Sequence, residues 1–301
     1  MSTQLSPAGT GGRPRTDAPA SAPARRRKPV TAGRVALYAV LSVVSLAWLF
    51  PVLWAVYNSF RDYGYTAVNG YVSFGGFTLE NYANAWERGN FGQFFLNTVI
   101  IVVPSVAITL ALASMVAFVL ARFSWKLNIA MLVVFTAANL LPQQALLIPL
   151  FRFFPRVGPY DTYWAVIIVH IAFQMGFCTF VLSNYMKTLP KELTEAAFVD
   201  GAGVLRQYWQ IILPLCRPPL AALATLQVTW VYNDFFWAVS FMSTGSKFPV
   251  TSALNNLQGQ FFIDYNLLSA GSVIVAVPTL VVFFALQRHF VSGLTLGANK
   301  G

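Results

Sequence analysis

The sequence predicts an all-α integral membrane protein with six transmembrane helices, and three observations support this fold class. Of the 301 residues, 56% are hydrophobic and only 10% are charged, and the mean hydropathy is +0.59. A soluble domain carries about a quarter charged residues, so this chain has too little polar surface for water to be its main solvent. The charged residues are also nearly absent from six long apolar stretches, which indicates that lipid surrounds these stretches.

Each apolar stretch is long enough to cross the hydrocarbon core of a bilayer, which takes about 20 residues. The six stretches are residues 35–57, 94–120, 127–151, 164–185, 220–242 and 267–287. Prolines lie within four of them, and a helix bundle tolerates such prolines because neighbouring helices satisfy the freed carbonyl groups. The third stretch has the least defined boundaries, because it contains Asn139, Pro142, Gln143 and Gln144.

The first 30 residues differ in composition from the rest of the chain. They are rich in Pro, Ala, Ser, Thr, Gly and Arg and offer little that a core could bury, which predicts a disordered basic tail at 1–30 and a transmembrane domain at 31–301. A cleaved signal peptide is the alternative, but residues 35–57 are too long for its apolar region and lack a clear small-residue cleavage site. The net charge of +10 does not indicate nucleic-acid binding, because no aromatic stacking platform accompanies it.

The distribution of Lys and Arg orients the predicted bundle. If the N-terminus is cytoplasmic, fifteen of the twenty Lys and Arg residues lie on the cytoplasmic side of the six spans. The five on the other side are Arg61, Arg88, Arg152, Arg156 and Lys247. Positive charge accumulates in cytoplasmic loops, so both termini are expected to face the cytoplasm.

The loop between the fourth and fifth spans, residues 187–217, has the pattern of two short helices joined at glycines. Pro190 suits a first helical turn, and Glu192 and Glu195 complement the positive end of the helix dipole. Gly201 and Gly203 can supply the left-handed residue that ends this helix, and a second helix is expected over 204–212. The pattern alone fits a protruding interaction surface or an ordinary loop at the membrane interface.

A few polar residues lie inside the predicted spans. Asp234 follows Tyr232 and Asn233 in the fifth span, and an ionisable group within a span usually faces a cavity or a partner. It could instead lie near the outer end of the helix, wetted by the interface. Asn139, Gln143, Gln144 and Gln174 fit either a polar path or hydrogen bonds between helices. His170 is interpreted as a packing residue, and no residues have metal-ligand spacing.

Several catalytic and nucleotide-binding patterns are absent from the sequence. There is no phosphate-binding loop of the form G-x-x-x-x-G-K-[ST], and no G-x-S-x-G or H-E-x-x-H pattern. The two cysteines, Cys178 and Cys216, suggest neither a disulfide framework nor a zinc site and are expected to pack in the protein. The chain is therefore not expected to be an enzyme, and any energy for transport must come from a separate subunit.

The 187–217 loop resembles a known family at its most specific positions. Glu195-Ala196-Ala197, then Gly201 and the sequence Ile211-x-Leu213-Pro214, is similar to the EAA motif of permeases in binding-protein-dependent ABC importers. The resemblance implies the type I importer fold, with a bundle core at about 93–288 and coupling helices that dock into an ATP-binding subunit. It implies a coupling role for the loop residues Glu192, Glu195, Ala196, Ala197, Asp200, Gly201 and Ala202.

Further matches resemble the carbohydrate class within this family. They are the segment from Ile148 to Thr162, residues 78–82, and the chain end at 293–301, which is similar to the smaller six-span partner of the maltose-type transporters. The resemblance implies import of a sugar or oligosaccharide, with a homologous second permease, two ATP-binding subunits and an extracytoplasmic solute-binding protein. It also implies the bacterial cell membrane as the location, and ATP and magnesium on the partner ATPase.

On this interpretation Tyr232, Asn233, Asp234, Gln143 and Gln174 line the translocation path. An ion-coupled secondary transporter is the alternative within transport, but it usually shows buried charged pairs and inverted repeats. The sequence shows a single acid in a span and no internal repeat. A membrane scaffold or receptor without transport activity is the alternative from another class.

Overall fold

The computed structural model describes residues 32–124, 126–259 and 262–295, the last ten as backbone only. The predicted basic tail at 1–30 and the chain end at 296–301 lie outside these residues. Within the described ranges the regular elements are helical, and one isolated bridge joins Arg61 and Phe77. The prediction of an all-α protein is therefore confirmed.

Four described helices are long and apolar enough to cross a membrane by themselves. They are α1 (Ala32–Ser59), α4 (Phe91–Arg122), α7 (Tyr163–Thr188) and α14 (Tyr265–Thr295), and they coincide with the first, second, fourth and sixth predicted spans. Two further segments qualify only as bent pairs of helices, 128–138 with 143–157 and 204–215 with 217–232. By length and composition, the described chain has four spans, or up to six if each bent pair is one span.

The third predicted span, residues 127–151, is not one helix. It consists of α5 (Asn128–Ala138), which bends by 95° into η1 (Gln143–Leu146) and α6 (Leu147–Val157). The break coincides with Pro142, which has no N–H to donate and which disfavours helical geometry at the residue before it.

The fifth predicted span, residues 220–242, is also divided. Helix α11 (Arg217–Tyr232) ends before Asn233, and α12 (Phe236–Phe241) begins after an interruption of three residues. The Asp234 carboxylate accepts hydrogen bonds from the backbone N–H groups of Trp237 and Ala238, both at 3.3 Å. Asp234 therefore satisfies donors at the start of α12, as an N-capping side chain does.

Shorter helices fill the connections between the long ones. Before α4 they are α2 (Tyr63–Asn69) and α3 (Glu80–Arg88), and between α7 and α11 they are α8 (Glu192–Val199), α9 (Val204–Gln207), the π-helical turn η2 (Tyr208–Ile212) and α10 (Leu213–Leu215). Between α12 and α14 they are η3 (Gly245–Lys247), α13 (Val250–Ala253) and η4 (Leu254–Leu257).

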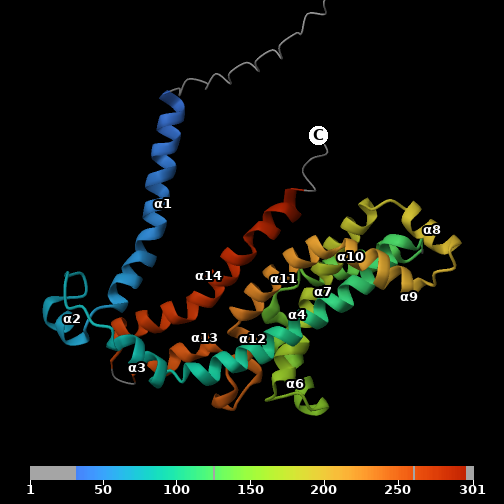
Figure 1. The fold of residues 1–301 in the computed structure, drawn as a ribbon. Coiled ribbons are helices and arrows are strands. Elements are labelled where there is room, and N and C mark those ends of the chain that lie inside the picture. Colours follow the sequence, from blue (N-terminus) through green and yellow to red (C-terminus); the bar gives the residue numbers. More distant parts are fainter. Residues whose placement is uncertain (1–31, 125, 260–261, 296–301) are drawn as a thin grey trace, which may run out of the picture. The chain divides into compact units, whose positions relative to one another are not determined.

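The chain divides at Pro51, inside α1, into two compact units, residues 1–50 and 51–301. The described part of the first unit, residues 32–50, is one apolar helix. In the second unit α4 and α7 pack side by side over much of their length, α11 packs against α4 and α14, and α5 packs against α7 (Figure 1).

Two hydrophobic clusters hold this second unit together. The larger one joins the first halves of α4 and α7 to α12, α13 and α14, with Trp237 and Phe241 stacked at its centre at 5.5 Å between ring centroids. The smaller one joins the second halves of α4 and α7 to η2 and α11 through Phe118, Leu182 and Ile212. The α4–α7 pair is therefore the common support for both ends of the bundle.

The segment between α1 and α4 is organised by a buried arginine. The Arg61 side chain is fully buried, and its guanidinium donates to the carbonyl oxygens of Tyr71 and Gly75 and to the side-chain oxygens of Asn58 and Ser73. The ring of Tyr57 lies 5.5 Å from the guanidinium carbon. Neutral oxygen atoms and an aromatic face therefore compensate this charge.

A carboxylate joins two other loops. Asp161, before α7, accepts hydrogen bonds from the backbone N–H groups of Ser243 and Thr244, both at 2.9 Å, and from the Thr244 hydroxyl at 2.6 Å. Lys247 Nζ lies 3.1 Å from the same carboxylate. We call this cluster, Asp161 with Ser243, Thr244 and Lys247, the Asp161 clamp. These donors stabilise the charged form and hold the pKa of Asp161 well below its usual value.

Candidate functional sites

The first candidate site is the protruding pair of helices α8 and α9, whose joint is fixed by a glycine. Gly201 has a φ of +76°, in the left-handed region where glycine is favoured. The N–H of Ala202 donates to the carbonyl of Ala197 and the N–H of Gly201 to that of Phe198, which is the Schellman arrangement at a helix C-terminus. The Gln207 side chain then donates to the Ala202 carbonyl at 2.8 Å and closes the joint.

The joint is tied firmly to the bundle on one side. The hydroxyl groups of Tyr208 and Ser114 lie 2.7 Å apart, which links η2 to α4, and the Tyr208 ring packs 5.5 Å from that of Phe118. Arg122, the last residue of α4, donates to the carbonyl of Leu189 at 3.2 Å. These contacts connect the α8–α9 joint directly to α4.

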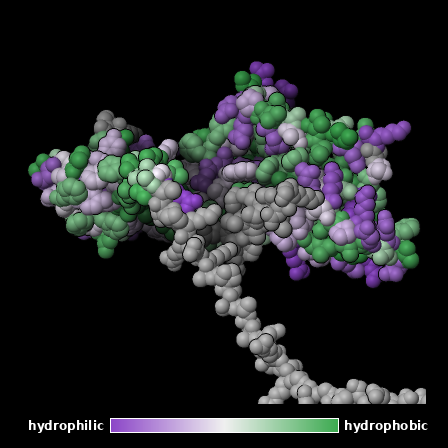
Figure 2. Space-filling view, turned by 90° about the horizontal axis from the view of Figure 1, so that it is seen from above, coloured by the Kyte–Doolittle hydropathy of each residue, from purple (hydrophilic) through white to green (hydrophobic). Residues whose placement is uncertain are grey.

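The opposite side of the joint is exposed and apolar. Phe198, Val199 and Leu205 are 76%, 85% and 74% exposed. Figure 2 shows hydrophilic and hydrophobic side chains intermixed at the right-hand end of the molecule, the end where Figure 1 places α8 and α9. Glu192, Glu195, Ala196, Asp200 and Gly201 are exposed on this loop, Ala202 is half-buried, and Ala197 is buried. The structure thus brings the seven predicted coupling residues together on one protrusion, with six of them accessible.

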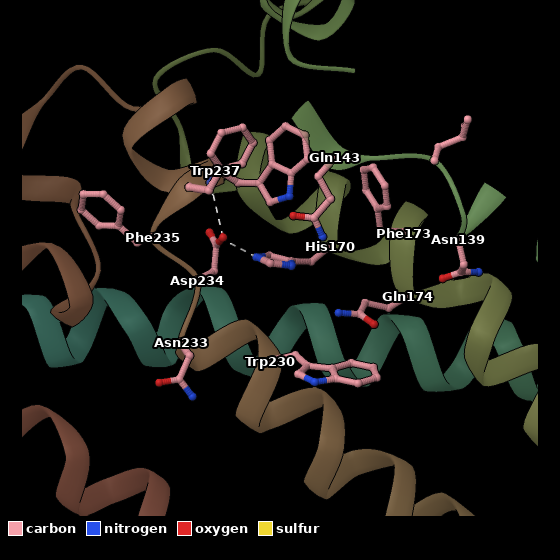
Figure 3. Close-up of a pocket in the computed structure, with 12 residues that line it drawn as sticks. Asn139, Gln143, His170, Phe173, Gln174, Trp230, Asn233, Asp234, Phe235 and Trp237 are labelled. Atoms are coloured by element: carbon pink, nitrogen blue, oxygen red, sulfur yellow. Dashed lines mark hydrogen bonds and ion pairs between the residues drawn. The ribbon is translucent and has the colours of Figure 1, made fainter. Parts of the chain in front are cut away.

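The second candidate site is a cavity of about 580 Å³ that lies beside two interruptions of the helices, one after α5 and one after α11. Asn139 and Gln143 reach it from the break after α5, Asn233 and Asp234 from the break after α11, and His170 and Gln174 from α7. Aromatic side chains complete its wall: Phe173, Trp230, Phe235, Phe236 and Trp237 (Figure 3). Irregular backbone at membrane depth is tolerated where it lines such a cavity.

A buried contact between a histidine and a carboxylate lies in this cavity. The Nε2 atom of His170 is 3.5 Å from Oδ2 of Asp234, and the two side chains are only 7% and 11% exposed. Figure 3 shows the imidazole directed at the carboxylate. At this distance the two atoms form no hydrogen bond, and His170 Nε2 has no hydrogen-bond partner in the described protein. A hydroxyl-bearing ligand could bond to both side chains.

Two residues lie elsewhere than the sequence suggested. Tyr232 does not line the cavity: it is buried between α11 and α14, where its hydroxyl donates to the carbonyl of Val275 at 2.8 Å, one turn before Pro278. His170 was interpreted as a packing residue, yet it faces Asp234. A signal for it existed, because His170 and Gln174 are four residues apart and therefore share a helix face.

The cysteines and the acidic residues give no sign of a metal centre. Cys178 and Cys216 are both buried and unpaired. Among the residues that the structure describes, no group of three or more His, Cys, Asp or Glu side chains could hold a metal ion. The two candidate sites are thus a protrusion with exposed apolar side chains and a polar cavity, and in the described residues neither has the composition of a metal centre.

Comparison with known proteins gives the family. The family of binding-protein-dependent transport system inner membrane components matches residues 110–295. A probable ABC transporter permease protein of Pyrococcus horikoshii is 33% identical over 83% of this chain and 92% of its own length. The diacetylchitobiose uptake system permease protein of Streptomyces coelicolor is 31% identical over 87% of this chain and 88% of its own.

A solved structure has the same fold. A chain of a bacterial ABC transporter involved in the import of the acidic polysaccharide alginate superposes with a TM-score of 0.75 at 19% identity, covering 85% of this chain and 95% of that chain. The family match and the permease relatives therefore do not support the ion-coupled carrier or the scaffold without transport activity. This chain belongs to the binding-protein-dependent transport system inner membrane components, as a multi-pass permease subunit of an ABC importer and not an enzyme.

Proposed function

We propose that this chain is one of two homologous permease subunits in a bacterial ABC importer of oligosaccharides. The remaining partners are two ATP-binding subunits and an extracytoplasmic solute-binding protein. The uptake of diacetylchitobiose by the Streptomyces relative supports the substrate class, as does a cavity that combines aromatic faces with amide and carboxylate groups. Sugar rings stack on aromatic side chains, and their hydroxyls bond to amides and carboxylates.

In the proposed topology the third and the fifth predicted spans each cross the membrane once despite their breaks, which gives six spans, and both termini face the cytoplasm. The distribution of Lys and Arg along the chain supports this orientation. The α8–α9 protrusion then lies on the cytoplasmic side and the Asp161 clamp outside. ATP and magnesium belong to the partner subunit, because this chain has no phosphate-binding loop.

One observation carries the proposal: the α8–α9 protrusion exposes an apolar surface on one side and is tied to α4 on the other. Exposed apolar surface of this kind marks a protein contact. When ATP brings the two ATPase subunits together, the protrusion moves with its ATPase and pulls on α4. The bundle then opens toward the docked binding protein, and hydrolysis resets it.

The cavity serves as part of the translocation path in this proposal. Its lining comes from α7, α11, α12, η1 and the breaks after α5 and α11, so that α5 and α11 both end at the cavity. Relative movement of the broken segments would open the cavity to one side of the membrane at a time. Asn139, Gln143, Gln174, Asn233 and Asp234 would bind the sugar hydroxyls as it passes.

The first test removes the docking surface. Glu195→Lys reverses a charge on α8, and Gly201→Asp puts a side chain at a left-handed position. We expect both variants to insert in the membrane normally but to retain the ATPase on affinity purification about tenfold less well, as for a central contact residue. Uptake should be abolished accordingly.

Two matched controls separate docking from general damage. Glu87→Lys reverses an exposed acid on α3, and Gly158→Asp strains another glycine in the left-handed region, with a φ of +103°. Both controls should retain the ATPase. Wild-type ATPase retention and uptake in the Glu195 and Gly201 variants would refute the coupling role.

The second test concerns the cavity. Asp234→Asn removes a charged acceptor, and we expect about tenfold slower transport of the sugar carried by the cognate binding protein, measured in proteoliposomes with the assembled complex. Asp264→Asn is the control, because Asp264 also accepts hydrogen bonds at a helix start but lies outside the cavity. Equal transport rates in wild type and Asp234→Asn would rule out a role in the path.

A further inference from the structure

A second large cavity, of about 770 Å³, lies between the last turn of α4, the start of α5, the end of α7 and the first turn of α8. Its charged lining is unbalanced: Arg122, Lys126, Lys187 and Lys191 are cationic, and Glu195 is the one acid. We call it the basic cavity. Within the described residues none of these cations forms an ion pair with a carboxylate.

The arginine of this cavity is incompletely bonded. Arg122 uses its Nη1 atom for the carbonyls of Leu189 and Pro190, but its buried Nε and Nη2 atoms have no hydrogen-bond partner. These two nitrogens form the fork that binds the two oxygens of a phosphate or carboxylate. A buried charged donor without a partner destabilises the folded protein, so Arg122 lacks an acceptor that a bound anion would supply.

The remaining lining indicates which kind of anion fits. Leu120, Ala121, Phe123 and Ile129 add apolar surface beside the cations. Acyl chains are complementary to such surface, whereas a free anion gains nothing from it. Basic cavities between helices at the inner face of a membrane are suited to anionic lipid headgroups.

We propose that the basic cavity binds a phosphate-bearing anion, and that an anionic phospholipid is its source. Arg122 and the three lysines hold the phosphate, and the apolar residues contact the acyl chains. Because Lys191, Thr194 and Glu195 of the cavity belong to the start of α8, a bound lipid also holds the α8–α9 protrusion in place. This last consequence rests on the proposed coupling function, and the position of the cavity at the inner face rests on the proposed topology.

Binding is tested on the assembled transporter, purified with its ATPase subunits and stripped of lipid. Short-chain phosphatidylglycerol, short-chain phosphatidylcholine and inorganic phosphate are each titrated while the thermal unfolding midpoint is recorded. The test variant is Lys126→Gln/Lys187→Gln, because both lysines are exposed and leave the Arg122 contacts unchanged. The control is Arg88→Gln/Arg156→Gln, which removes two exposed cations away from the cavity.

We expect phosphatidylglycerol to raise the midpoint and phosphatidylcholine not to, with an affinity about tenfold or more weaker in the test variant than in the control. A rise with inorganic phosphate alone, also lost in the test variant, would keep the site but overturn the lipid as its source. Equal phosphatidylglycerol affinity in both variants would overturn the site.

The link to α8 is tested separately, by ATP hydrolysis in nanodiscs with and without phosphatidylglycerol. Anionic lipid should change the binding-protein-stimulated rate of wild type and control several-fold more than that of the test variant. If lipid binds but the rates respond equally, the link to α8 is wrong while the site stands. Failure of the ATPase to co-purify with wild type would instead refute the proposed function.

Discussion

At the scale of single residues, the Asp161 clamp makes stability depend on pH. The pKa of Asp161 is lowered in the folded protein, so its carboxylate stabilises the fold fully above the ordinary value of about 4. This contribution is lost as the pH falls from there toward the lower folded value. We expect Asp161→Asn to lower the thermal midpoint by a few degrees at pH 7, and the difference to shrink below pH 4. A difference that is constant with pH would contradict this assignment.

Residue identities in the sequence indicated some of these roles but not others. Asp234 could be singled out because an acid within a span needs a partner or a cavity. The partner, His170, comes from another helix, and its choice depends on how α7 faces α11. Arg61 could not be predicted to be buried, because four neutral acceptors compensate it and, in the described protein, no acid forms an ion pair with it.

At the scale of helices, a glycine sets how closely α5 approaches α7. A Cβ atom added at Gly176 would overlap two atoms at the end of α5. They are the carbonyl oxygen of Phe135 and the side-chain nitrogen of Asn139. We expect Gly176→Leu to displace α5 and to destabilise the protein by about 1–3 kcal/mol. Thermal unfolding in detergent measures this, with Ala172→Leu on an exposed part of α7 as the control. Equal midpoints for the two variants would show that the close approach is unimportant.

The helices were predictable to different degrees. The long apolar runs correctly predicted α1, α4, α7 and α14. The glycine at position 201 correctly predicted the end of α8 and its joint with α9. Pro142 and its polar neighbours left only the boundaries of the third span poorly defined, and the 95° break there was not predicted. The break after Tyr232 was not predicted, because no proline or glycine precedes Asp234. Only the structure shows that its carboxylate starts a new helix there.

At the scale of the whole transport unit, the hydroxyl of Tyr208 connects the protrusion to the bundle. Tyr208→Phe keeps the ring packing and removes the bond to Ser114, a loss of about 1 kcal/mol. We expect normal ATPase retention but fewer sugar molecules transported per ATP hydrolysed, measured in proteoliposomes. Tyr160→Phe removes a similar bond, to Ser243, outside the loop, and should leave this ratio unchanged. An unchanged ratio in Tyr208→Phe would show that force passes by another route.

The buried arginine between α1 and α4 has a consequence for the environment that this segment tolerates. Arginine keeps its charge at any pH that a cell meets, and the oxygens around Arg61 belong to carbonyl, amide and hydroxyl groups that do not titrate there. Acidification therefore changes no charge within this cluster, unlike the Asp161 clamp. The contacts of Arg61 should therefore persist at an acid pH at which the Asp161 clamp loses its charge.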